Sequence, residues 1–384
     1  MRKPIEIVGA GPAGLSAALT ITSRGGQAVV YERHSDVGRR FHGDFQGLEN
    51  WTVDIDVLDE FASIGVEPTF EYTPFTEAVF FDPNGREYVF RSARPIWYLV
   101  RRGSDAGTLD QSLRRQALDA GAEIRFNTVQ EHLPNGGIVA HGPRRPDAIA
   151  VGYIFDCDRA NGAFSVAAEE LAPKGYSYLL ICNGRATVAS CLFQDFHNEA
   201  TYLERTVDFF TDKVGITLVN ARRFGGYGNL LPVRNARKGR MLYVGEAAGL
   251  QDALFGFGIR YAVLSGHLAG RAFLEGGPKR YRALLDERFD SLLKAAVVNR
   301  YFYEKLGNRG YVKLLRRVER AADVGDWLRA FYGSGHTKSL LYPVAHRKLS
   351  RKPDLIRECA EGCDCTWCRC GDRAACACRS RVSA

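Results

Sequence analysis

The chain has 384 residues, of which 46% are hydrophobic and 25% are charged, and its formal net charge is +8. This length and composition belong to an ordinary globular protein with a large core or two closely packed domains, which excludes a fibrous or disordered chain. No apolar run approaches the roughly 18 residues of a membrane span, and an apolar run beginning at Ile5 leaves no room for a signal peptide. We therefore expect a cytoplasmic protein that does not bind nucleic acid.

The first 32 residues carry the pattern of a dinucleotide-binding βαβ unit. A short apolar run ends at Gly9, and Gly11 and Gly14 complete the sequence G-x-G-x-x-G. A helix of small residues such as Ala13 follows, and a second apolar run closes on Glu32. The glycines permit a tight turn and close approach to a pyrophosphate, the helix N-terminus attracts phosphate, and the acid accepts hydrogen bonds from a ribose. This order of elements predicts that the chain binds a dinucleotide.

Residues 33–51 have no clear periodicity and are expected to form a loop. Its Arg33, Arg39 and Arg40 either reach the nucleotide phosphates or face solvent. A helical pattern follows at 51–61.

A strand–helix–strand module at 97–126 fits a return to the first sheet. Its first strand ends in Arg101 and Arg102. An arginine at a strand end can bind phosphate, or it can form a structural ion pair with Asp105 or Asp110. We favour the phosphate role.

Residues 130–230 change character. Short apolar runs separated by turns have the spacing of an antiparallel meander. A D-P-N-G turn between two further runs predicts a hairpin of the same kind of sheet. The meander runs lie at 152–158, 176–182 and 187–193, the hairpin at 78–81 and 88–90, and an associated helix at 199–213.

A second strand end delivers an acid and a glycine-rich helix start to one place. The apolar run 241–244 is followed by Gly245 and Glu246, and Gly256 and Gly258 precede a helix that begins at Ile259. Glu246 is suited to accept from ribityl or ribose hydroxyls, and the helix start is suited to face a flavin ring.

At these residues the chain resembles FAD-dependent oxidoreductases of the glutathione-reductase-like, p-hydroxybenzoate-hydroxylase-like class, and within it the geranylgeranyl reductase family. Gly9 to Glu32 matches the family's first motif, and Gly245 to Ile259 resembles its second flavin motif. Arg101 or Arg102 resembles the arginine before the family's next helix, and Val129 is counted with the same cofactor site. The segment 173–189 resembles the family's G-Y-x-W-x-F-P strand. The resemblance implies an α/β fold, in which a Rossmann-like FAD-binding domain is interrupted by an antiparallel β-sheet substrate domain.

This sequence departs from the family at several positions. Glu246 replaces the usual Asp, and the Pro between this acid and the next helix is missing. The family's Trp and Phe-Pro pair are absent from 176–182, so the polyprenyl substrate is not carried over. Residues 152–158 lack the D-G motif of aromatic hydroxylases, which argues against a hydroxylase.

No second G-x-G-x-x-G follows a strand, so a dedicated NAD(P)H domain is not expected. Electrons would come from a carrier protein such as ferredoxin, or from NAD(P)H visiting the flavin. Since flavin chemistry asks of the protein mainly binding, orientation and a proton, no side-chain triad is required. Tyr176, Tyr178 and Cys182 lie at alternating positions of one strand. Either one of them donates a proton, or all three pack in the hydrophobic core. His267 is expected to be packed.

The C-terminal part divides into a basic helical region and a cysteine-rich tail. In residues 278–350, apolar residues recur at helical spacing. The basic face of these helices either lies on lipid headgroups or is solvated.

Seven of the ten cysteines fall in the last 26 residues, at Cys359, Cys363, Cys365, Cys368, Cys370, Cys376 and Cys378. The C-x-C and C-x-x-C spacings predict thiolate metal binding, zinc ahead of an Fe–S cluster, in a metallothionein-like arrangement. A redox-labile tail without metal is the alternative.

We expect an FAD-binding domain (1–70, 96–130 and 236–277), a substrate domain (71–95 and 131–235), a helical region (278–350) and the tail (351–384). The expected function is FAD-dependent reduction of C=C bonds in an isoprenoid or other apolar substrate, with peripheral membrane contact left open. The alternatives are a flavin monooxygenase and, from another class, a metal-binding or redox-sensing protein built on a flavoprotein fold.

Overall fold

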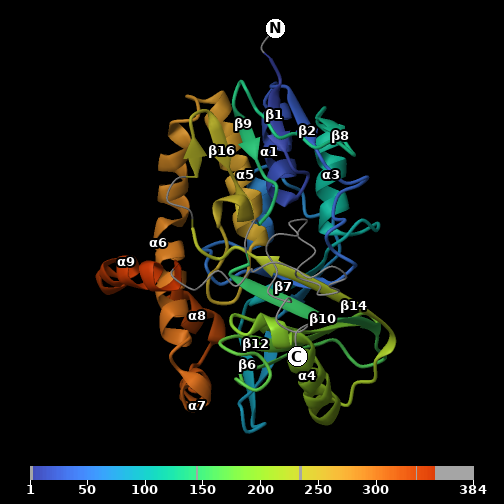
Figure 1. Cartoon of the computed structure of the whole chain (residues 1–384), viewed down its shortest axis with the longest axis vertical. Coiled ribbons are helices and arrows are strands. Elements are labelled where there is room, and N and C mark those ends of the chain that lie inside the picture. The colour runs from blue at the N-terminus through green and yellow to red at the C-terminus, as the bar shows by residue number, and fades with distance from the viewer. Residues whose placement is uncertain (1–2, 144–145, 233–235, 334, 351–384) are drawn as a thin grey trace, which may run out of the picture.

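The computed structural model describes residues 3–143, 146–232, 236–333 and 335–350. Figure 1 shows a nucleotide-type sheet with its helices at one end, a second large sheet at the other, and a column of C-terminal helices along one side. The metal-binding predictions for the cysteine-rich tail concern residues outside these ranges.

The first sheet has six strands in the order β15-β16-β9-β1-β2-β8. All neighbours pair in parallel except β15 and β16. Parallel strands joined by helices are the arrangement that the glycine motif predicts. The strands are β1 (Ile5–Val8), β2 (Ala28–Tyr31), β8 (Glu123–Arg125), β9 (Gly137–Val139), β15 (Arg237–Lys238) and β16 (Met241–Tyr243).

Small residues let two helices pack tightly beside this sheet. Helix α1 (Pro12–Thr22) lies against α5 (Ile259–Leu274) and α3 (Leu109–Asp119). A Cβ added to Gly266 would lie 2.0 Å from the Ala13 oxygen, so only glycine permits this approach. Thr20 Oγ1 lies 3.0 Å from His267 Nδ1 between α1 and α5, which confirms that His267 is packed.

The second sheet has seven strands in the order β14-β10-β13-β12-β11-β5-β6, antiparallel except where β11 meets β5. Helix α4 (Glu199–Val214) packs on β10 and β13. A third sheet of three strands has the order β3-β7-β4. The remaining strands are β3 (Phe45–Glu49), β4 (Tyr72–Phe75), β5 (Glu77–Phe81), β6 (Glu87–Arg91), β7 (Trp97–Arg101), β10 (Ala148–Asp156), β11 (Gly162–Val166), β12 (Tyr176–Cys182), β13 (Arg185–Leu192) and β14 (Val219–Gly228).

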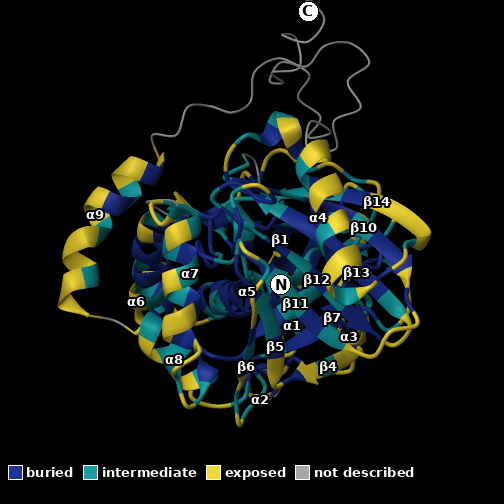
Figure 2. Ribbon diagram, turned by 90° about the horizontal axis from the view of Figure 1, so that it is seen from below, coloured by how far each residue is buried: buried dark blue, intermediate teal, exposed yellow. Residues whose placement is uncertain are grey.

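Four helices follow α5 in the described part of the chain. They are α6 (Arg280–Tyr303), α7 (Gly307–Val318), α8 (Val324–Tyr332) and α9 (His336–Ser350). Helices α7 and α8 pack against β6, and α9 packs against α6. Burial in Figure 2 falls from the sheets toward this last helix, which stands at the edge of the molecule. None of the helices in the described ranges is long and apolar enough to cross a membrane.

The expected fold class is confirmed: a Rossmann-like domain, an antiparallel sheet and a helical C-terminal region are all present. Three details differ. Strand β9, expected in the second domain, pairs with β1 and β16 in the first sheet. Strand β7, expected in the first sheet, pairs with β3 and β4 instead. Helix α2 (Val57–Ser63) begins where Asp56 accepts a hydrogen bond from Leu58 N, later than the pattern at 51–61 suggested. Strands of three to five residues carry too little periodicity to reveal their partners.

Candidate functional site

One large cavity lies where the two large sheets and the C-terminal helices meet. Its volume is about 1720 Å³, more than the roughly 300–1,000 Å³ of a typical small-molecule pocket. It reaches from the first glycine motif to side chains of α7 and α8. There is therefore room for two molecules, such as a cofactor and a substrate.

The first glycine motif forms one end of the cavity. Gly9 has φ +99°, and a Cβ on Gly14 would lie 1.9 Å from the Gly9 oxygen, so both positions require glycine. Gly11 is the N-cap residue of α1 and lines the cavity, and a Cβ there would meet no atom within 4 Å. No side chain caps this helix. Its first N–H groups are thus available to an anion in the cavity.

Glu32 lies at the end of β2 and lines the same end of the cavity. Its carboxylate accepts hydrogen bonds from Ala10 N at 2.8 Å and His34 N at 2.9 Å. Because a carboxylate has about four acceptor positions, two remain for hydroxyl groups of a ligand. The two backbone bonds hold the carboxylate in place for that role.

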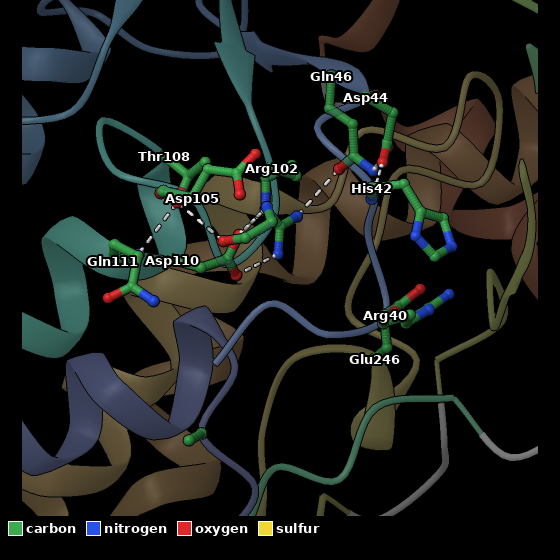
Figure 3. A network of polar contacts seen from close by, with 12 residues as sticks. Arg40, His42, Asp44, Gln46, Arg102, Asp105, Thr108, Asp110, Gln111 and Glu246 are labelled. Carbon is green, nitrogen blue, oxygen red and sulfur yellow. Dashed lines mark hydrogen bonds and ion pairs between the residues drawn. The ribbon is translucent and has the colours of Figure 1, made fainter. Parts of the chain in front are cut away.

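The second motif meets the loop after β2. Arg40 Nη1 donates to Glu246 Oε2 at 2.7 Å, and Arg40 Nη2 donates to the Tyr227 oxygen. Figure 3 shows Arg40 and Glu246 side by side. Gly258 begins α5 without a side-chain cap. A second helix start without a side-chain cap therefore lines the same cavity as Glu246, far along the chain from the start of α1.

A buried polar network lies between these two ends (Figure 3). Arg102 donates twice to Asp110, at 2.9 Å each, and to Gln46 Oε1 at 3.0 Å. Gln46 in turn donates to Asp44 Oδ2 at 3.2 Å. Burial raises the pKa of Asp44, and the hydrogen bond from His42 N opposes this shift. Of the two roles considered for Arg102, the structure shows the ion pair with Asp110.

Arg101 faces the other way. Its side chain binds Glu71 Oε1 at 3.1 Å and the Ala106 oxygen at 2.5 Å, and it does not line the cavity. The expectation that Arg101 contacts a cofactor phosphate therefore finds no support in its position. Alternate residues of a strand point to opposite faces, so only one of two adjacent arginines can face the cavity.

Of the three candidate proton donors on β12, two reach the cavity and one does not. Tyr176 and Tyr178 line the cavity, but Cys182 packs elsewhere, with its sulfur 3.2 Å from Thr73 Oγ1. Cys191, directly opposite Tyr176 on β13, lines the cavity instead. Burial raises the pKa of Cys191 to about 12 and that of both tyrosines well above the usual value. All three groups keep their protons at neutral pH.

The hydroxyl groups of the two tyrosines differ. Tyr176 donates to the Phe255 oxygen, so its proton is engaged. Burial is the main cause of the raised pKa of Tyr178. Cys191 and the negative charge of Asp44 lie near enough to raise it further. Tyr178 is thus the better placed of the two to act on a ligand.

The other end of the cavity is apolar. It is lined by aromatic and aliphatic side chains of β5, β6, α7 and α8: Phe80, Phe90, Leu314, Val318, Trp327 and Phe331. Phe331 and Trp327 stack with their ring centroids 4.8 Å apart. Such a surface binds a hydrocarbon chain by removing it from water.

The cofactor candidates from the sequence are therefore mostly brought together. Those that line the cavity are Gly9, Gly11, Ala13, Glu32, Arg33, Arg40, Arg102, Val129, Gly245, Glu246, Gly256, Gly258 and Ile259. Gly14 acts behind them through close packing. Two uncapped helix starts, an acid with spare acceptor positions and the open space at Gly11 fit the phosphates, ribose and ring of FAD.

Sequence reasoning missed part of the site. His42, Asp44 and Gln46 line the cavity, yet they lie in a stretch that reads as an unpatterned loop or its end. The one available signal was the alternation of polar Asp44 and Gln46 around apolar Phe45, which is typical of a strand. Among the described residues, no group of His, Cys, Asp and Glu has the arrangement of a metal site.

Comparisons with known proteins agree with this geometry. Residues 7–55 match the model of an NAD(P)-binding Rossmann-like domain. Digeranylgeranylglycerophospholipid reductase 2 of Methanopyrus kandleri is 24% identical over 93% of this chain and 98% of its own.

Two solved structures share the fold. A geranylgeranyl bacteriochlorophyll reductase-like protein of Thermoplasma acidophilum has a TM-score of 0.69 at 19% identity, over 90% of this chain and 98% of its own. A flavin-dependent brominase has a TM-score of 0.62 at 14% identity, over 91% and 99%. The fold is thus that of flavin-dependent enzymes, and the resemblance of this chain to the geranylgeranyl reductase family of FAD-dependent oxidoreductases is confirmed over nearly its whole length.

Proposed function

We propose that this protein is an FAD-dependent oxidoreductase that reduces C=C bonds of an isoprenoid or another long apolar substrate. One observation carries the proposal: a single cavity joins the dinucleotide motif to an apolar end lined by β5, β6, α7 and α8. A relative of similar length, named for the reduction of a digeranylgeranyl lipid, supports the same substrate class.

Each part of the cavity has a task in this proposal. Gly11 and the start of α1 bind the pyrophosphate of FAD, and Glu32 binds its ribose. Glu246 and the start of α5 bind the part nearer the ring. When bound, FAD supplies the hydride equivalent, and the protein orients it and excludes water.

Tyr178 is our candidate for the proton donor. Tyr178 lines the cavity that also holds the cofactor residues and the apolar end, and Asp44 lies near enough to affect its pKa. Because burial raises the pKa of the phenol, its proton is present when substrate binds.

The electron donor in this proposal is ferredoxin or NAD(P)H. Neither donor requires a second dinucleotide-binding domain in this chain, because ferredoxin is a separate protein and NAD(P)H can bind transiently beside the flavin. Stopped-flow reduction of the FAD-loaded protein by each donor distinguishes them.

The first test is an absorption spectrum of the purified protein, followed by anaerobic addition of a geranylgeranyl compound to the reduced enzyme. We expect a flavin spectrum that bleaches on reduction and returns on adding the alkene. A protein that binds no FAD, or whose reduced flavin is indifferent to the alkene, contradicts the proposal.

A flavin monooxygenase is the second candidate, because a flavin-dependent brominase shares the fold. Such an enzyme consumes oxygen in proportion to product, whereas a reductase forms product without oxygen. Oxygen consumption measured beside product formation decides between them.

The third candidate concerns the tail, in which seven cysteines from Cys359 to Cys378 are spaced for thiolate ligation. We propose that they bind zinc or an Fe–S cluster as an accessory to the enzyme. Metal analysis of the full chain beside a chain ending at residue 358 tests this. Equal metal content in both contradicts it, and loss of flavin from the shorter chain favours a metal or redox protein on a flavoprotein fold.

A further inference from the structure

Helix α9 carries an exposed stripe that its contacts leave uncovered. The side facing the body holds Tyr342, Ala345, His346 and Leu349, which are buried or half-buried. The opposite side exposes Leu340 by 79% and Val344 by 52%, with Leu341 at 36% beside them. Figure 2 shows α9 at the edge of the molecule, exposed along most of its outer side.

The same stripe becomes basic toward the end of the helix. Arg347 and Lys348 follow Leu340 by seven and eight residues, so they share its face. Both are exposed, and α9 contains no Asp or Glu. We define the α9 stripe as Leu340, Leu341, Val344, Arg347 and Lys348.

Two other residues of α9 contact the backbone of segments near the apolar end of the cavity. Lys338 Nζ, at the start of α9, donates to the oxygen of Phe331, the residue whose ring lines the apolar end. Asn299 of α6 donates to the same oxygen at 3.1 Å. Further along, His346 Nε2 lies 3.3 Å from the Pro232 oxygen, two residues beyond cavity-lining Leu230.

We propose that α9 docks the protein on the surface of an anionic lipid bilayer, with Leu340, Leu341 and Val344 entering the headgroup region and Arg347 and Lys348 contacting lipid phosphates. An apolar face beside exposed cations is what an interfacial helix presents to such a surface. The placement rests on the proposed function, because it sets the apolar end of the cavity next to a reservoir of apolar substrate.

Other occupants fit less well. The 34 residues after α9 contain seven Arg or Lys and five Asp or Glu, so they offer no acidic complement to the stripe. A second copy of α9 would bring its own Arg347 and Lys348 and no acid. Of these three, the bilayer supplies both a negative surface and an apolar medium for the leucine side chains.

The experiment uses the full FAD-loaded chain and sedimentation with vesicles of phosphatidylcholine, with and without phosphatidylglycerol. We expect binding to the anionic vesicles that weakens with salt, and little binding to phosphatidylcholine alone. The Leu340→Glu, Val344→Glu double variant is expected to lose at least about tenfold in partition coefficient, because two apolar side chains no longer leave water. Leu118→Glu on α3, 41% exposed in the native chain, is the matched control and is expected to bind like the native protein.

The proposal is overturned if the native chain ignores anionic vesicles or if the double variant binds them as the native chain does. It is also overturned if the native chain is a dimer that the double variant dissociates, since the stripe is then an interface between copies. If the protein binds the vesicles but does not reduce the alkene, the proposed function is contradicted and the docking surface is supported. If it reduces the alkene but does not bind the vesicles, the docking surface is contradicted and the proposed function is supported.

Discussion

Gly11 and Gly14 offer a pair of substitutions that separates cofactor binding from folding. In Gly14→Ala the new methyl would lie 1.9 Å from the Gly9 oxygen, a backbone atom that moves only if α1 shifts from β1. We expect a loss of about 3 kcal/mol or more in unfolding free energy, the upper range for overpacking. FAD binding falls with it.

In Gly11→Ala the methyl meets nothing within 4 Å, because it points into the cavity. At an N-cap position this change costs only about 0.5 kcal/mol, or roughly 1–2 °C in Tm for a chain of this size. If a pyrophosphate lies against Gly11, the methyl displaces at least one charge-assisted hydrogen bond, worth about 1.5–3 kcal/mol. The Kd for FAD then rises by roughly ten- to 150-fold.

The assay is titration of each apoprotein with FAD by flavin fluorescence, beside thermal unfolding of the same apoprotein. Gly11→Ala should keep its Tm and lose affinity, whereas Gly14→Ala should lose both. Native affinity in a well-folded Gly11→Ala protein would refute the placement of the pyrophosphate at the start of α1.

Three further predictions concern residues that line the cavity or are buried near it. Tyr178→Phe should slow product formation by about 10²-fold or more while FAD binding stays native; unchanged turnover removes Tyr178 as proton donor. Arg40→Ala and Glu246→Gln should weaken FAD binding non-additively, with a coupling of about 0.5–1 kcal/mol for this partly exposed pair, and strictly additive losses would show that the pair does not act as a unit. Burial raises the pKa of Asp252 to about 6, so its carboxyl stabilises the fold most below about pH 4 and this contribution is lost as the pH rises through 6. The unfolding free energy of the native protein minus that of Asp252→Ala should therefore fall by roughly 2–3 kcal/mol from pH 4 to pH 7; a difference that is flat with pH contradicts this.

The features that the sequence predicted well depend on local backbone requirements. Gly9 needs a positive φ and Gly14 needs the absence of a Cβ, and both needs are met within one turn of chain. The helix expected within 97–126 likewise begins where the side chain of Thr108 accepts a hydrogen bond from Gln111 N, three residues further along. Patterns of this kind are visible in a single sequence because the residue and the backbone feature that requires it lie within a few positions of each other.

The features that it could not predict depend on contacts between distant parts of the chain. Buried Arg260 binds Glu60 and Glu49, about 200 residues away. Nothing in the sequence around either glutamate indicates that it pairs with Arg260. Arg102 was open to two roles until Asp110 was placed beside it by the turn into α3. The apolar end of the cavity joins β5 and β6 to α7 and α8, and only the packed structure brings these elements to one surface.

The most direct test of the central claim is the mass of the product formed without oxygen. The FAD-loaded protein, reduced anaerobically, is mixed with a geranylgeranyl lipid, and the extracted lipid is analysed by mass spectrometry. A reductase adds the mass of two hydrogen atoms for each double bond reduced, with flavin reoxidised in equal amount. An unchanged lipid, or a product that appears only with oxygen and carries an added oxygen atom, would contradict the account.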